Sequence, residues 1–309
     1  MVETRIEQLK DLLRREVTNL CRHDNVRWKS PLTNTLSQIR MNAWPAVFFG
    51  GTLRSLLISR ITKDVPGRPR DIDIVLSVNS VNDVERQFQE WVSRKTRYGG
   101  IGLWRRGWQF DLWPVTETFA FKQTRCLEPG FEELPKTTFL NAEAIAIDVW
   151  TQPGKPRKIY SGDDQFFHGV LTATLDVNQI DNPFPELSVL RALVMANHLR
   201  WKIAPRLAAF ITTHGTRISP VDLIEIQKHH YNVVRLPWTN YKAMLNMILK
   251  SVDNDPARPV ALRFERQIGL WSDFDERYSV EPLIRLTNTS RKPRKHKQVR
   301  TNLSLLEAL

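Results

Sequence analysis

The segment from Ala46 to Leu76 constrains the fold of this 309-residue chain more than any other. A short apolar run, AVFF, ends directly at Gly50-Gly51, which predicts a buried strand that enters a tight turn. Residues 52–60 predict a helix, residues 61–70 a basic loop with proline and glycine, and residues 71–76 (DIDIVL) a second strand. We therefore expect an α+β fold built around these two strands.

The overall charge indicates a polyanionic partner. The chain has 45 lysine and arginine residues against 33 aspartates and glutamates, a formal net charge of +12. A surface this basic suits phosphate-bearing ligands, nucleic acid or anionic lipid. Hydrophobic residues make up 41% of the chain, enough for a buried core, which excludes a disordered or fibrous protein.

Cellular location follows from what the sequence lacks. The charged N-terminal stretch is not a secretory signal, and no apolar run approaches the ~18 residues of a membrane span. Two cysteines, Cys21 and Cys126, are too few for a disulfide framework and favour a reducing compartment. We therefore expect a cytoplasmic protein with no membrane partner; its oligomeric state is left open.

The rest of the chain divides by pattern. Residues 3–20 and 82–95 predict amphipathic helices, and residues 101–115 predict a hairpin. Residues 141–150 are apolar and fit either a helix or a strand, whereas the patterns after about residue 185 are helical. We therefore expect four parts: an N-terminal helical segment at 1–45, an α+β unit with a small mixed sheet at 46–150, an all-helical unit at 151–290 and a basic tail at 291–309.

Asp71 and Asp73 are candidate metal ligands. In a strand, residues i and i+2 point the same way, about 6.6 Å apart, so their carboxylates repel unless a cation lies between them. Mg²⁺ takes one or two carboxylates plus substrate phosphates, and two such ions can hold the attacking and leaving oxygens of a phosphoryl transfer. Asp111, on the polar side of the predicted hairpin, is a candidate third ligand. The alternatives are two solvated acids on a surface strand and, for Asp111, an ion pair with Arg97, Arg105 or Arg106.

Gly50-Gly51 is a candidate phosphate-binding turn. Two glycines after a buried strand let the backbone approach a triphosphate closely, and the following helix offers free N–H groups. Arg54, one turn into that helix, could reach a phosphate. The alternatives are an ordinary tight turn and a solvated arginine.

These residues resemble the catalytic head of the DNA polymerase β-like nucleotidyltransferases. G50-G51-T52-L-R54 followed by D71-I-D73 is similar to their Gly-Gly loop and Asp-x-Asp strand, above all in class II tRNA nucleotidyltransferases (CCA-adding enzymes) and bacterial poly(A) polymerases. The resemblance implies a nucleotidyltransferase head at 46–150, a helical neck and body at 151–290, an NTP substrate and a two-metal Mg²⁺ site, with Mn²⁺ as an alternative. It also implies catalytic and metal-binding roles for Asp71, Asp73 and Asp111, and nucleotide binding by Gly50, Gly51, Thr52 and Arg54.

Two later stretches extend the resemblance. T138-F-L-N141-A is similar to the family's Phe-Thr-Ile-Asn-Ala stretch, and the helix around L190-R191-A is similar to the start of its neck. The resemblance implies that Asn141 and Arg191 contact the sugar or base of the nucleotide. The alternatives are that Asn141 caps a helix and that Arg191 pairs with an acid such as Glu186.

Departures from the family pattern concern nucleotide choice. Ser55 stands where the family has an aspartate after the loop arginine, and residues 136–138 lack the family's Arg-Arg-Asp. Residues 184–188 do not reproduce its base-reading acids and arginine. Recognition of CTP and ATP therefore cannot be carried over.

Three functions are consistent with these residues. The first is transfer of a nucleoside monophosphate from an NTP to an RNA hydroxyl, with a tRNA 3′ end as the first candidate acceptor, in repair or in a toxin or defence role. The second keeps the site but makes oligonucleotide second messengers or modifies a protein or small molecule. The third is a non-catalytic RNA-binding protein on a degenerate scaffold. Trp104, Trp108 and Trp113 are candidates for stacking on RNA bases, or else core residues.

Overall fold

The computed structural model describes residues 2–262 except 23–29, 63–68, 70, 97–98, 124–127, 180 and 182. The expected basic tail at 291–309 lies outside the described residues. The helices are α1 (Val2–Cys21), α2 (Ser30–Met41), α3 (Gly51–Ile61), α4 (Val81–Phe88), α5 (Phe119–Gln123), α6 (Gln165–Thr172), α7 (Pro185–Leu199), α8 (Pro205–Gly215), α9 (Pro220–Tyr231) and α10 (Trp238–Asn254). The strands are β1 (Ala46–Phe49), β2 (Asp71–Leu76), β3 (Val92–Lys95), β4 (Ile101–Arg105), β5 (Trp108–Pro114), β6 (Ala146–Asp148), β7 (Ile159–Tyr160), β8 (Thr174–Leu175) and β9 (Lys202–Ile203).

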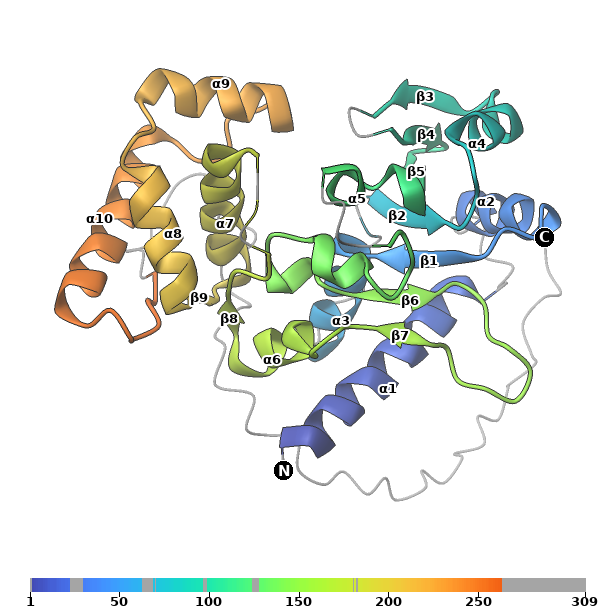
Figure 1. The fold of residues 1–309 in the computed structure, drawn as a ribbon, viewed down its shortest axis with the longest axis horizontal. Helices are drawn as coiled ribbons and strands as arrows, with labels where there is room; N and C mark the ends of the chain where they lie inside the picture. Colours follow the sequence, from blue (N-terminus) through green and yellow to red (C-terminus); the bar gives the residue numbers. More distant parts are fainter. Residues whose placement is uncertain are drawn as a thin grey trace, which may run out of the picture. The chain divides into compact units, whose positions relative to one another are not determined.

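A mixed seven-stranded sheet organises the first part of the chain (Figure 1). Its strand order is β3-β4-β5-β2-β1-β6-β7, with β2 and β5 parallel and the other neighbours antiparallel. Because parallel strands need a crossover, α4, β3 and β4 all lie between β2 and β5 in the chain. This crossover brings Asp111 beside β2.

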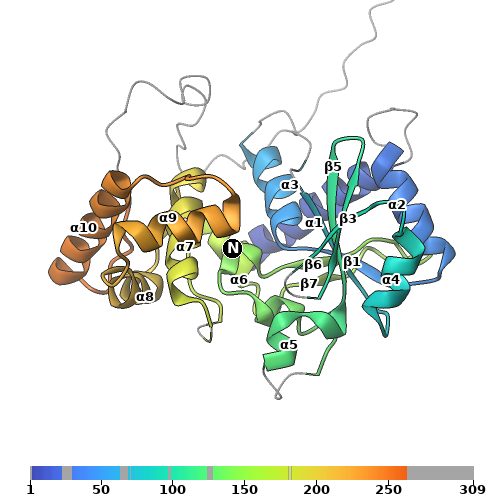
Figure 2. The same cartoon turned by 90° about the horizontal axis from the view of Figure 1, so that it is seen from above.

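Apolar side chains cover the two faces of the sheet unequally. The large core packs α1, α2, α3 and α4 on one face, and Ile72, Ile74 and Phe110 point into it. A smaller cluster on the other face includes Val47, Val75 and Phe121 of α5, so α3 and α5 lie on opposite sides of the sheet (Figure 2). The second face is covered only in part by this cluster, and Asp71, Asp73 and Asp111 point to that face beyond it.

Helices α7 to α10 follow the sheet in the chain and pack on one another. The side chains of Leu190, Leu207 and Tyr241 are fully buried or nearly so. Tyr241 donates a hydrogen bond to the carbonyl oxygen of Gly215 at 2.6 Å, which ties α10 to the end of α8. The α+β class with a helical part after the sheet is therefore present as expected.

Several local expectations are confirmed and others are wrong. The first two strands, the helix between them and the hairpin form where the patterns place them. The helix expected at 82–95 ends at Phe88, because Val92–Lys95 pairs as an edge strand with β4. Residues 146–148 become a strand, and β7 extends the sheet beyond residue 150. The unit expected to be all-helical from residue 151 also holds β7, β8 and β9, because backbone pairing adds these two-residue strands without a local pattern. The domain boundaries at 45 and 150 remain predictions.

Candidate active site

Three aspartates meet on one face of the sheet. In the parallel pair β2–β5, Asp73 lies directly opposite Asp111, and Asp71 lies opposite Gln109. Neighbouring strands are about 4.8 Å apart and facing residues project from the same side. The structure therefore brings together the three acids that the sequence singled out, although Asp111 follows Asp73 by 38 residues in the chain.

The electrostatics of this cluster centre on Asp73. Burial, followed by the negative charges of Asp71, Asp111 and Glu143, raises the pKa of Asp73 well above its usual range, and nearby Arg54 offsets this only in part. A carboxylate whose pKa is raised by burial and by like charges lies where a cation would be favoured. The repulsion between carboxylates that the Asp-x-Asp spacing led us to expect is therefore present, and metal binding by these residues remains a prediction.

The glycine turn lies directly against this cluster. Gly50 caps α3 with φ 55° and ψ −115°, a conformation that favours glycine. A Cβ added at Gly51 would lie 3.6 Å from the Asp73 carboxylate oxygen and 3.6 Å from the Arg54 guanidinium. The first N–H groups of α3, which have no partner within the helix, therefore begin beside Asp73.

Thr52 holds the two aspartates in place rather than facing solvent. Its side chain is buried; the hydroxyl accepts a hydrogen bond from the Asp73 N–H at 3.0 Å and donates to the Asp71 carbonyl oxygen at 3.3 Å. The hydroxyl thus joins the first turn of α3 to β2 between the two acids. Nucleotide binding by Thr52 remains a prediction, and the contact seen is a positioning one.

Asp111 is engaged by an arginine from two strands away. Arg94 of β3 donates to both carboxylate oxygens at 3.0 Å. An ion pair at Asp111 was one of the alternatives; the partner seen is Arg94, and Arg97, one of the arginines considered from the sequence, lies outside the described residues. Within the described ranges, no three His, Cys, Asp or Glu side chains are arranged as a ready metal cage.

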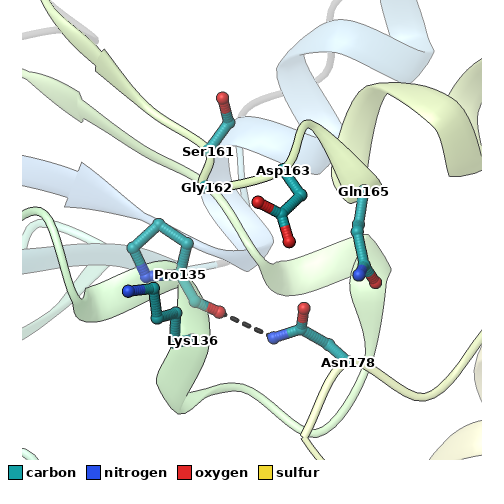
Figure 3. A pocket seen from close by; sticks show the side chains of 7 residues that line it. All are labelled: Pro135, Lys136, Ser161, Gly162, Asp163, Gln165 and Asn178. Atoms are coloured by element: carbon teal, nitrogen blue, oxygen red, sulfur yellow. Dashed lines mark hydrogen bonds between the residues drawn. The ribbon is translucent and has the colours of Figure 1, made fainter. Parts of the chain in front are cut away.

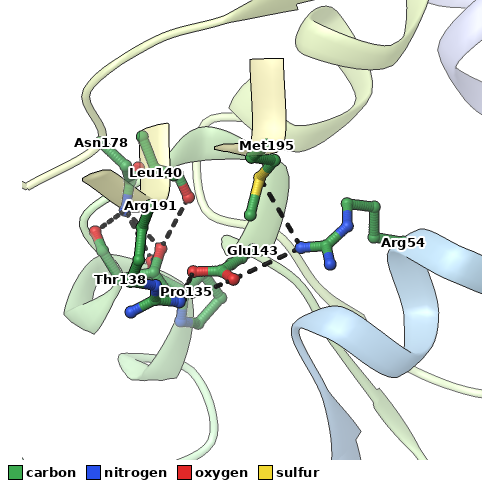
Figure 4. A network of polar contacts seen from close by, with 8 residues as sticks. All are labelled: Arg54, Pro135, Thr138, Leu140, Glu143, Asn178, Arg191 and Met195. Atoms are coloured by element: carbon green, nitrogen blue, oxygen red, sulfur yellow. Dashed lines mark hydrogen bonds and ion pairs between the residues drawn. The ribbon is translucent and has the colours of Figure 1, made fainter. Parts of the chain in front are cut away.

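A shared carboxylate joins α3 to α7 (Figure 4). Glu143, in the 3₁₀ turn Asn141–Glu143, accepts hydrogen bonds from Arg191 at 2.7 and 2.8 Å and from Arg54 at 3.3 Å. Burial alone would raise the pKa of Glu143, but the two guanidinium groups outweigh it and hold the pKa below its usual value. Arg54 also contacts the Met195 sulfur at 3.8 Å.

Sequence reasoning missed both Glu143 and Arg94. Glu143 is a lone acid in the apolar stretch FLNAEAIAI, a signal that could have marked a buried partner for a cation. Arg94 carries no comparable signal, because its position depends on the edge strand that the helical pattern concealed. Arg191 pairs with Glu143, whereas the sequence suggested Glu186.

Asn141 has a structural task in this fold. It is buried; its amide donates to the Thr174 carbonyl oxygen at 3.1 Å and accepts from the Asp176 N–H at 3.0 Å. A Cβ at Gly169 would lie 2.5 Å from the same amide, so α6 packs closely against it. Contact of Asn141 with a sugar or base remains a prediction.

A small hollow lies beside the 3₁₀ turn at Leu134–Thr137 (Figure 3). Its lining includes Pro135, Lys136 and Asn178, and the Asn178 amide donates to the Pro135 carbonyl oxygen at 2.7 Å. Lys136 pairs with Glu133 at 2.8 Å. None of the three aspartates lines this hollow. It is therefore separate from the aspartate cluster.

No family model and no curated protein sequence matches the chain. Solved structures similar in fold include a tRNA-processing enzyme in its apo form (15% identity, TM-score 0.46, 72% of this chain and 55% of that one). A CCA-adding enzyme with CTP is also similar, with 15% identity and a TM-score of 0.47 over 87% of this chain and 70% of that one. The Thermotoga maritima CCA-adding enzyme with tRNA has 14% identity and a TM-score of 0.47 over 78% of this chain and 60% of that one. The chain thus spans little more than half the length of the first of these. Identities this low leave the activity to be judged from the residues themselves.

No helix among the described residues combines the length and apolar character needed to cross a membrane.

Proposed function

We propose that the chain is a metal-dependent nucleotidyltransferase. It would move a nucleoside monophosphate from an NTP to an RNA hydroxyl and release pyrophosphate, with a tRNA 3′ end as the first candidate acceptor. The observation that carries the proposal is the meeting of Asp71, Asp73 and Asp111 on one sheet face with Gly51 and the start of α3 beside Asp73.

The donor set is suited to Mg²⁺ or Mn²⁺. Carboxylate oxygens are the ligands that Mg²⁺ prefers, and one or two of them suffice when substrate phosphates supply the rest. Burial first, and then the neighbouring carboxylates, raise the pKa of Asp73, so a cation at this point would be favoured. Asp71 and Asp73 would hold the ion, and Asp111 would join them on exchange of its Arg94 partner. A bound ion would supply neutralisation of phosphate charge and activation of the attacking hydroxyl.

The protein's own groups would position the reactants. The first N–H groups of α3, from Gly51 on, would bind triphosphate oxygens, while the Gly50 N–H donates to the Ile145 carbonyl oxygen at 2.9 Å and holds the turn. Thr52 keeps the two carboxylates of β2 in register with that turn. Such a site works by positioning and charge neutralisation, with little covalent chemistry. The net charge of +12 supports a nucleic-acid acceptor.

Labelled nucleotides test the proposal. The purified chain is incubated with Mg²⁺ or Mn²⁺, total RNA and each α-labelled NTP in turn, and the labelled species are sized. We expect label in RNA with one or a few NTPs, loss of labelling in Asp73→Asn, and full labelling in Asp253→Asn, a matched change at an exposed site on α10. Short soluble products formed without RNA would instead favour a messenger synthase. An Asp73→Asn variant that labels RNA like the wild type would refute the site.

A further inference from the structure

The face that carries the aspartates continues onto β3 and β4. One row of facing residues crosses four strands: Arg94 faces Gly102, Gly102 faces Asp111, and Asp111 faces Asp73. In a neighbouring row, Trp104 faces Gln109, which faces Asp71. Residues that face one another on adjacent strands project from the same side. Trp104 therefore lies on the aspartate side, two strands or about 10 Å from Asp71.

Arg94 reaches Asp111 by lying across a glycine. A Cβ added at Gly102 would come within 2.7 Å of both Cγ and Nε of Arg94. Because Gly102 has no side chain, the Arg94 side chain can lie directly over the backbone of β4. Its guanidinium ends on Asp111 while 54% of the side chain is still exposed. A solvent-accessible cation therefore lies at the edge of the acidic cluster, within reach of an incoming phosphate.

Trp104 is the exposed member of the three tryptophans considered from the sequence. It is 59% exposed, whereas Trp108 is buried in the core at 1%. Trp113 packs edge-on against Phe49, and its indole N–H donates to Thr118 at 3.1 Å. An exposed indole presents a π-face on which a nucleic-acid base can stack.

Charge near Trp104 suits a phosphate backbone. Arg106 is exposed at the tip of the β4–β5 hairpin, and Arg94 lies on the same sheet face as Trp104. Arg105 points to the opposite face, where its guanidinium lies 3.6 Å over the Trp91 ring. The aspartate side of β3 and β4 therefore combines one exposed aromatic ring with cations, the pairing used for single-stranded nucleic acid.

The strand order separates the two reactants. In the order β4-β5-β2-β1, the Gly50-Gly51 turn at the end of β1 flanks Asp73 on one side, and Trp104 and Arg94 lie on the other. The attacking and leaving oxygens of a phosphoryl transfer lie roughly in line across the phosphorus. A triphosphate at the glycine turn thus leaves the β3–β4 side for the acceptor.

We propose that Trp104 and Arg94 form the acceptor subsite for a single-stranded RNA end. The terminal base stacks on the Trp104 indole, and Arg94 exchanges the Asp111 carboxylate for a phosphate of the RNA. This inference rests on the proposed function for its orientation, but the RNA contact itself needs neither NTP nor metal.

Binding of a dye-labelled single-stranded RNA, followed by anisotropy without NTP or metal, tests the subsite. We expect Trp104→Ala to weaken binding about tenfold and Trp104→Phe, which retains an aromatic face, to weaken it by no more than about threefold. Arg94→Ala should lower the slope of log affinity against log salt by about one, as expected for one lost phosphate contact. Arg40→Ala, an exposed arginine on α2, is the matched control and should change neither value.

Stabilisation by NTP with Mg²⁺, measured on the same variants by thermal unfolding, separates the outcomes. Trp104→Ala should retain the nucleotide-induced shift in melting temperature. Wild-type RNA affinity in Trp104→Ala would overturn the subsite, and so would loss of the nucleotide shift with RNA binding intact, because the ring would then contact the NTP base. If no NTP shifts any variant while the RNA effects appear, the proposed function fails and the subsite stands.

Discussion

Removal of the Glu143 carboxylate is expected to destabilise the fold. Glu143→Gln keeps the side-chain volume but leaves Arg54 and Arg191 without their shared anion. Breaking a fully buried ion pair costs about 3–5 kcal/mol, whereas an exposed pair contributes about 0–1 kcal/mol. The exposed side-chain fractions are 16% for Glu143, 18% for Arg54 and 36% for Arg191, so the cost should lie between these limits. We expect about 2–3 kcal/mol of unfolding free energy.

Thermal unfolding followed by tryptophan fluorescence or circular dichroism measures this loss. For a chain of this size, about 2–3 kcal/mol corresponds to a fall of roughly 3–5 °C in melting temperature. Glu186→Gln is the matched control, because Glu186 is the partner that the sequence suggested for Arg191. It should shift the melting temperature by less than about 2 °C, as expected of a surface substitution.

The pH dependence gives a second readout with a defined sign. The folded-state pKa of Glu143 lies below its ordinary value of 4.5, so its stabilising contribution is present above that value. The contribution is lost as the pH falls through the lowered folded-state pKa. The gap between wild type and Glu143→Gln should therefore be full at pH 7 and shrink below about pH 4.5. Equal melting temperatures of the two proteins at pH 7, or an equal loss in Glu186→Gln, would refute the role given to this carboxylate.

Three further predictions concern the aspartate face. Asp73→Asn should raise the melting temperature at pH 8 without metal, because the raised pKa of Asp73 means that ionising it opposes folding as the pH rises; a lower value than wild type would contradict this. Thr52→Val should lower unfolding free energy by about 1–3 kcal/mol in denaturant titrations, since it leaves the Asp73 N–H without its acceptor; an unchanged midpoint would show that this bond is dispensable. Gly102→Val should displace Arg94 from Asp111, and titration with Mn²⁺ followed by electron paramagnetic resonance should show tighter ion binding than in wild type; weaker binding would show that Arg94 does not compete with the ion.

Local patterns allowed much of the sheet to be predicted, but its edges could not be. The alternation in β5 placed Asp111 opposite the apolar face correctly, because a two-residue period decides the side of every residue in a strand. The same reasoning failed for Val92–Lys95, where pairing with β4 outweighs a pattern that also suits a helix. The register between strands that are distant in the chain has no local signal, so only the structure shows that Asp73 faces Asp111.

Partners of the charged residues were harder still. The sequence marked Arg54 and Arg191 individually, but their shared anion comes from a 3₁₀ turn in a segment that fitted helix or strand equally well. Thr52 was grouped with nucleotide ligands by its place in the motif, whereas its hydroxyl joins the backbone of β2 to α3. A motif specifies which residues gather at a site, while packing decides which of them faces the ligand.

The parallel pairing of β2 with β5 has a consequence for the order of folding. Asp71 and Asp73 belong to a strand that is connected to its antiparallel neighbour β1 through residues 50–70, which include α3. The strand of Asp111 is separated from β2 by residues 77–107, which include α4, β3 and β4, and pairing across a longer separation is slower. We therefore expect the mutually repelling carboxylates to meet late in folding. By then the rest of the sheet has formed, and its packing offsets the electrostatic repulsion between them.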